Sequence, residues 1–121
     1  MIPPFLRLSA VTSIGRHEMI PRVKDAILKG GGFIQDFLLI SDLSICLNFE
    51  LRVGNIHRLS ASLKAAGLRL SEESTRLLAN CCAGLEQLEE RARASEVTGT
   101  LAISFIHDEP DLRIEVPPIP G

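Results

Sequence analysis

The chain contains no tryptophan and no tyrosine, and it has only five phenylalanines among its 121 residues. Proteins that bind single-stranded nucleic acid without sequence preference stack the bases on such aromatic side chains, so their scarcity disfavours that class. A strongly basic face is missing too, because the formal net charge is −2. Since nucleic acids and anionic lipid surfaces attract basic proteins, the composition predicts neither partner.

Long apolar runs are also absent, because no segment approaches the roughly 20 apolar residues that span a bilayer. Residues 1–5, MIPPF, lack the basic start and the apolar centre of a secretory signal. The three cysteines, Cys46, Cys81 and Cys82, are odd in number and have no C-x-x-C spacing, as is typical of free thiols in a reducing compartment. The sequence therefore predicts a cytoplasmic protein with no membrane partner.

The chain does have enough apolar content for one compact core. Hydrophobic residues make up 45% and charged residues 23%, which is ordinary for a globular protein of this length. No stretch has the composition of a linker between domains. We predict a single domain over residues 1–121, with a core over 6–70, a helix and hairpin over 71–116, and a tail over 117–121.

Hydrophobic periodicity predicts the elements of that core. Residues 6–14 and 43–52 alternate between apolar and polar side chains, as half-buried strands do. Residues 33–41 are apolar on both sides, which is typical of a strand covered on both faces. Helical spacing over residues 21–30 and 55–66 predicts two amphipathic helices, each ended by glycine.

The second half of the chain continues this alternation of helix and strand. A short strand at residues 68–70 precedes Ser71, which we expect to cap a third helix. Apolar residues spaced by three and four extend this helix to about Arg93. Residues 97–107 and 112–116 are then predicted to form a second hairpin.

The first six elements follow the order β-α-β-β-α-β. With right-handed crossovers, this order predicts an α+β, ferredoxin-like antiparallel sheet with both helices on one face and residues 6–14 beside 43–52. The C-terminal helix and β-hairpin would extend this core. Because the strand at 33–41 is apolar on both sides, we expect the third helix and another subunit both to contribute to covering the opposite face. We therefore predict a homodimer.

Residues 6–70 resemble the ACT family of small regulatory domains. The positions that carry the resemblance are the strand end at Ile14-Gly15, the helix residues Val23 and Leu28, Gly31 and Ile34 around the second strand, and Leu59, Leu63 and Ala66-Gly67-Leu68. The resemblance implies a domain that binds an amino acid or another small effector, often at a subunit interface, through the first loop and the start of the next helix.

That first loop, residues 15–20, is the candidate ligand site. It leads into a helix N-terminus, whose free N–H groups attract a carboxylate or a phosphate, and Arg16 adds a bidentate donor. The alternative is an ordinary solvated loop that binds no ligand, and the sequence does not decide between the two. The predicted ligand-binding residues are Gly15, Arg16, His17 and Glu18 of this loop, with Gln35 and Asp36 of the next strand.

Patterns for catalysis or metal binding do not occur. The chain lacks a G-x-S-x-G elbow and a phosphate loop, and its three histidines lack zinc spacing. His107 precedes an acidic turn, residues 108–111, which is commoner as a charged hairpin turn than as a cation site. We predict no catalytic residue, no metal and no cofactor, and we do not expect an enzyme.

Two functions follow from these observations. The first is a regulatory domain that senses an amino acid or a similar small anionic metabolite at a dimer interface. The second is a ligand-free module for protein interaction or oligomerisation, in which residues 71–116 provide a docking surface. ACT domains often carry Asp followed by Pro-Gly in the first loop, and the Gly-Arg-His-Glu of residues 15–18 favours the second function. The retained glycine and the length of the loop favour the first function.

Overall fold

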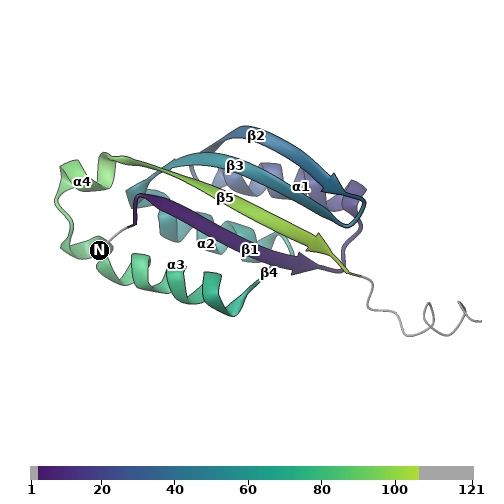
Figure 1. Ribbon diagram of the computed structural model, residues 1–121. Helices are drawn as coiled ribbons and strands as arrows, with labels where there is room; N and C mark the ends of the chain where they lie inside the picture. Colours follow the sequence, from purple (N-terminus) through teal and green to yellow (C-terminus); the bar gives the residue numbers. More distant parts are fainter. Residues whose placement is uncertain (1–2, 107–121) are drawn as a thin grey trace, which may run out of the picture.

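The computed structural model describes residues 3–106 of the chain. It is a mixed α+β structure with a five-stranded sheet (Figure 1). The strands are β1 (Phe5–Thr12), β2 (Gly32–Ser41), β3 (Ser44–Arg52), β4 (Arg69–Leu70) and β5 (Glu96–Phe105), and the α-helices are α1 (Arg16–Lys29), α2 (Ile56–Ala65), α3 (Glu72–Gly84) and α4 (Glu90–Ala94).

Strands β1 and β3 follow the alternation expected from the sequence. On each strand every second side chain is buried, and the side chains between them reach the opposite face. The buried positions of β5 alternate in the same way. The buried apolar side chains of these strands are Leu6, Leu8 and Ala10 of β1, Ile45, Leu47, Phe49 and Leu51 of β3, and Val97, Leu101, Ile103 and Phe105 of β5.

The order of the strands differs from the predicted ferredoxin-like order. The sheet runs β2-β3-β5-β1-β4, so β1 and β3 are not neighbours. Strand β5 lies between them, parallel to β1 and antiparallel to β3. The alternation of β1 and β3 shows which face each strand buries, but it does not identify the neighbouring strand, because strands distant in sequence satisfy the same pattern. The C-terminal strand is therefore part of the core and not an addition to it.

Helices α1 and α2 lie on one face of the sheet, as the sequence predicted (Figure 1). Their buried residues, among them Val23, Ile27, Leu59 and Leu63, join the apolar side of the strands in one core. Gly31 and Gly67 have φ values of 90° and 102°, so each supplies the left-handed conformation that ends its helix.

Helix α1 begins earlier than the sequence suggested. Residues 16–20 were expected to form a loop before Pro21, but they are helical and Pro21 lies inside the helix. Met19 is fully buried, and Gly15 O accepts hydrogen bonds from the amides of Glu18 and Met19. This packing outweighs the hydrogen bond that Pro21 cannot donate.

Helix α3 begins as predicted, because the side chain of Ser71 accepts a hydrogen bond from Ser74 N. It ends at Gly84, and a single 3-10 turn, Leu85–Gln87, separates it from α4, so the expected continuous helix to Arg93 is wrong. Glycine has a low helix propensity, which favours a break at this point. Helix α3 packs against α2 and β1, and Figure 1 shows it alongside β1, not over the uncovered face of the sheet.

The face opposite α1 and α2 is more polar than expected at its centre. The side chains there include Ser9, Asn48, Thr98 and Thr100, with Cys46 and Ala102 among them. Strand β2 is not covered on both faces, because it is the edge strand and most of its side chains are exposed. The predicted strand at 112–116, the tail at 117–121 and His107 lie outside the described residues.

Gly99 provides a test of the central position of β5. It pairs with Leu6 of β1 and with Phe49 of β3, and a Cβ atom there would lie 2.6 Å from Phe49 Cζ and 2.8 Å from Leu6 O. We expect Gly99→Ala to lower the free energy of unfolding by about 1–3 kcal/mol, the usual cost of overpacking. Urea unfolding followed by circular dichroism measures this change.

Gly84→Ala is the matched control for that substitution. A Cβ atom at Gly84 would meet nothing within 4 Å, and its φ of −92° suits any residue. This variant should leave stability unchanged or raise it by about 0.4–1 kcal/mol. Equal unfolding midpoints for the two variants would contradict the packing of β5 between β1 and β3.

Candidate functional site

The predicted ligand loop occupies the junction between β1 and α1. Gly15 is the N-cap residue of α1, with no side-chain cap, and Arg16, His17 and Glu18 form the first helical turn. A Cβ atom at Gly15 would meet nothing within 4 Å, so the junction is open to solvent. The structure thus keeps an uncapped helix N-terminus at this position, with Glu18 paired to Arg22 at 2.6 Å.

Arg16 is directed toward the turn between β2 and β3. Its Nη1 lies 3.4 Å from both the backbone oxygen and the Oδ1 of Asp42. The Asp42 side chain is 96% exposed, so solvent screens this ion pair and it adds little to stability. The contact nevertheless links the first turn of α1 to the β2–β3 turn.

Gln35 and Asp36 do not join the other predicted ligand residues. Strand β2 runs toward Asp42 from its first residue, and six residues of strand separate Asp36 from that turn, roughly 20 Å at about 3.3 Å per residue. The Asp36 carboxylate accepts a hydrogen bond from Phe37 N at 2.9 Å. Gln35 lies where a β-bulge interrupts the pairing of β2 with β3. The six predicted residues therefore belong to two separate regions.

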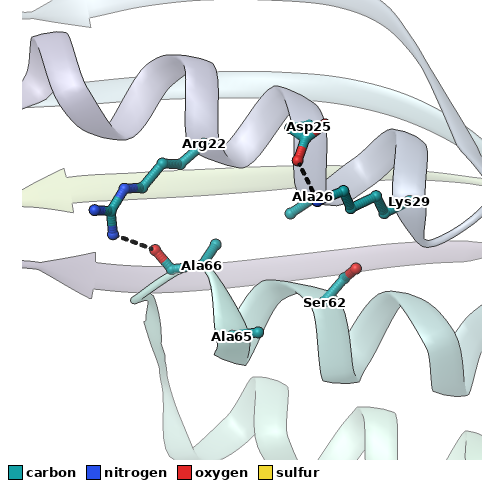
Figure 2. Close-up of a pocket in the computed structure, with 7 residues that line it drawn as sticks. All are labelled: Arg22, Asp25, Ala26, Lys29, Ser62, Ala65 and Ala66. Atoms are coloured by element: carbon teal, nitrogen blue, oxygen red, sulfur yellow. Dashed lines mark hydrogen bonds and ion pairs between the residues drawn. The ribbon is translucent and has the colours of Figure 1, made fainter.

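A shallow pocket of about 250 Å³ lies between α1 and α2 (Figure 2). Its charged side chains are neutralised within α1, since Arg22 pairs with Glu18 and Lys29 pairs with Asp25 at 3.0 Å. Arg22 also donates to Ala66 O at 3.5 Å across the pocket. With small side chains at its base and no unpaired cation, this pocket offers little to hold a ligand. The residues that line it are Arg22, Asp25, Ala26, Lys29, Ser62, Ala65 and Ala66.

A second pocket, of about 240 Å³, brings a thiol and an imidazole to one cavity. Cys82, His57, Glu86 and Arg93 all line it. Burial raises the pKa of the Cys82 thiol, and the nearby Lys64 opposes this shift only in part. Because the thiolate is the nucleophile of cysteine chemistry, a raised pKa makes Cys82 a poor nucleophile at neutral pH. Among residues 3–106, no group of three or more potential ligands is arranged to hold a metal ion.

The most unusual surface is formed by exposed apolar side chains on β2 and the turn after it. Seven large hydrophobic residues are exposed among those that the structure describes, and five of them lie between residues 33 and 43. The other two, Phe5 and Leu28, lie elsewhere on the surface. We name this surface the β2 patch; its residues and their exposed fractions are Phe33 (66%), Leu38 (50%), Leu39 (56%), Ile40 (62%) and Leu43 (55%).

The β2 patch extends over both faces of the sheet edge. Leu38 is paired with Cys46 and therefore points to the uncovered face, whereas Leu39 is paired with Ile45 and points to the side of the helices. Within residues 3–106, strand β2 has β3 as its one neighbour in the sheet, so no described residue pairs with its outer backbone edge. The sequence indicated a strand apolar on both sides, but it could not show that this strand lies at an edge.

At the opposite edge of the sheet α3 lies alongside β1, and the backbone of residues 9–11 is satisfied there (Figure 1). Strand β4 pairs with β1 at Ala10 and Val11. Before these residues, Ser9 O accepts a hydrogen bond from Ser71 N, and Ser9 N donates to Ser74 Oγ at 2.8 Å. The backbone groups of Ser9 are therefore satisfied by the start of α3, in the way that natural sheets protect an edge.

Comparison of the chain with protein-family models, with curated proteins and with solved structures found no match. The resemblance to ACT domains therefore stays a prediction. None of the helices in the described part of the chain is both long enough and apolar enough to cross a membrane.

The buried thiols of α3 predict a dependence of stability on pH. Burial, and then the neighbouring Cys82, raise the pKa of Cys81 above the ordinary thiol value of 9.0. As the pH rises above 9.0, the unfolded chain loses this proton before the folded protein does, so the free energy of unfolding should fall. Urea unfolding at several pH values between 8 and about 10.5 measures this slope.

Cys81→Ala should make the slope shallower, since it removes one of the two thiols. Leu77→Ala is the control, because it shortens a partly buried side chain of the same helix and removes no titratable group. If Cys81→Ala and the wild type lost stability equally steeply, Cys81 would not be the source of the effect.

Proposed function

We propose that this protein is an association module that binds a protein partner through the β2 patch. The observation that carries the proposal is the position of five exposed apolar side chains on the uncovered edge of the sheet. An exposed strand edge of this kind is a template for pairing with another chain, which natural proteins otherwise avoid. In β-strand addition the backbone hydrogen bonds give affinity and the alternating side chains give specificity.

The position of the patch in the sequence supports this proposal. Four of its five side chains lie within residues 38–43, and each of them is at least half exposed. A concentration of exposed apolar side chains often marks an interaction site. The two pockets described above have no comparable feature: the charges of the pocket between α1 and α2 are paired, and the Cys82 thiol of the second pocket has a raised pKa.

Two β-bulges define which part of β2 can pair regularly. They interrupt the ladder with β3 between Ile34 and Asp36 and between Leu39 and Ser41. Bulges commonly restrict pairing at the edge of a sheet. Here they leave a regular segment, residues 36–39, whose only charged side chain is Asp36.

Replacing patch residues by lysine should abolish association. We expect the wild-type protein, in a fresh extract of its own cells, to elute from a size-exclusion column in an assembly larger than the 13.2 kDa chain. The double variant Leu38→Lys, Ile40→Lys should elute as the free chain, because a partner strand would have to bury two charges. Each protein carries a small epitope tag, and an antibody against the tag detects it in the column fractions.

Leu28→Lys is the matched control, since Leu28 is 57% exposed on α1 and lies outside the β2 patch. It should elute with the wild type. Elution of the wild-type chain from the extract as a 13.2 kDa monomer would refute the proposed function.

A second candidate function is the sensing of an amino acid or a similar small anionic metabolite at the first turn of α1. The observation that favours it is that the amides of Arg16 and His17 have no acceptor within the helix, and the described residues supply none. With Arg16 beside them, these N–H groups suit a carboxylate. The contact of Arg16 with Asp42 connects this position to the turn that carries Leu43 of the β2 patch. Neither candidate function includes a chemical reaction.

Thermal unfolding in the presence of each of the twenty amino acids at millimolar concentration tests the sensing function. At about 100 times its dissociation constant, a ligand of the folded state stabilises it by about 2.7 kcal/mol, so at least one amino acid should raise the melting temperature clearly. Arg16→Ala should remove the shift, whereas Arg76→Ala, at another exposed helical arginine, should retain it. The absence of a shift with all twenty would count against this function.

A further inference from the structure

We propose that the partner of the β2 patch is a second copy of this chain, paired antiparallel through β2 about a two-fold axis at Leu38. This inference rests on the proposed association function and names its partner. In the resulting dimer, two five-stranded sheets would form one continuous sheet, with β2 of each copy at the centre.

The first argument is that each copy has one open sheet edge. Helix α3 lies alongside β1, and with β4 it satisfies the backbone of residues 9–11 at that edge, whereas the edge at β2 is bare among the described residues. A molecule with two open edges could add copies without limit, but one with a single open edge can join a second copy only through the same edge of both. Such a pairing is isologous and closes at the dimer.

The second argument is the side-chain pattern of the regular segment 36–39. In an antiparallel pair, residues directly opposite each other point to the same face, so a two-fold axis must pass through a residue position. An axis at Leu38 places Leu38 opposite its own copy on the uncovered face. It also places Phe37 opposite Leu39 of the second copy on the side of the helices, so apolar side chains meet on both faces.

Neighbouring positions of the axis are less favourable. An axis at Leu39 would bring Asp36 opposite Asp42 of the second copy, and like charges directly across strands are destabilising. An axis at Phe37 would place the Asp36 carboxylate opposite Leu38 of the second copy, next to the axis. The axis at Leu38 moves each Asp36 one position further out, opposite Ile40 of the second copy, where the bulge between Leu39 and Ser41 interrupts β2. The axis at Leu38 also lies between the two bulges, which interrupt β2 on either side of it.

The third argument is the kind of surface that each arrangement would bury. Edge pairing brings apolar side chains of the two β2 strands together on both faces of the sheet. A face-to-face dimer through the uncovered side of the sheet would instead bury the polar centre formed by Asn48, Thr98 and Thr100. Edge pairing leaves this polar surface in solvent.

A disulfide across the axis tests the arrangement. Directly opposite residues of antiparallel strands have Cα atoms about 4.5–5.5 Å apart, which is within the range of about 4.4–6.8 Å for disulfides. We expect Leu38→Cys to cross-link two copies under mild oxidation. Because Cys46 lies opposite Leu38 within the same chain, the variant must be made together with Cys46→Ser, Cys81→Ala and Cys82→Ser.

The matched control is Leu28→Cys in the same cysteine-free background, since Leu28 is equally exposed but lies on α1. Circular dichroism confirms that both variants fold. Near-complete cross-linking of the Leu38→Cys variant, with little for the Leu28→Cys variant, supports the axis. Failure of a folded Leu38→Cys variant to cross-link overturns it.

Light scattering of the purified wild-type protein, which needs no substitution, tests the identity of the partner. We expect twice the chain mass of 13.2 kDa at 100 µM. A monomer under these conditions, together with a larger assembly in the cell extract, would overturn the second copy as partner and leave the association function standing with another protein. A monomer in both experiments would refute both proposals.

Discussion

The double pairing of β5 is the constraint on which the rest of the structure depends. This strand is paired along its length with β1 on one side and β3 on the other, from Phe5–Thr98 to Thr12–Phe105 and from Ser44–Ser104 to Arg52–Glu96. Gly99 makes this possible at the closest point, because its missing side chain leaves room for the Phe49 ring. With β5 at the centre, β3 is an interior strand along its length. On its outer side β1 pairs with β4 only at Ala10 and Val11 and lies next to α3, and β2 forms the other edge of the sheet.

The two edges of the sheet differ in their backbone pairing and in their exposed side chains. At one edge, β4 and the serines at the start of α3 satisfy the outer backbone of β1 at residues 9–11, and α3 lies alongside the strand. At the other edge, β2 combines an open backbone with the largest concentration of exposed apolar side chains in the described residues. This asymmetry favours association through β2 over a function in the pockets. It also limits association to one partner strand per copy.

Local patterns in the sequence identified most elements but not all of their limits. The alternation of β1 and β3, the glycine ends of α1 and α2 and the Ser71 cap of α3 were predicted and are confirmed. The predicted start of α1 was wrong, because burial of Met19 outweighs the effect of Pro21. The predicted end of α3 was also wrong, because the apolar spacing after Gly84 does not keep the helix intact. Of the six predicted ligand residues, the first four lie together at the start of α1, and Gln35 and Asp36 lie apart from them on β2.

The sequence by itself determined which side of each strand and helix is apolar, since a period of two or of 3.6 residues is a local property of the chain. It also determined the one strand that is apolar on both sides. Only the tertiary structure decided that this strand lies at an edge and that β5 lies between β1 and β3. Those outcomes depend on pairing between segments far apart in the sequence, where several partners satisfy the same alternation and the fit of side chains such as Phe49 against Gly99 selects one of them.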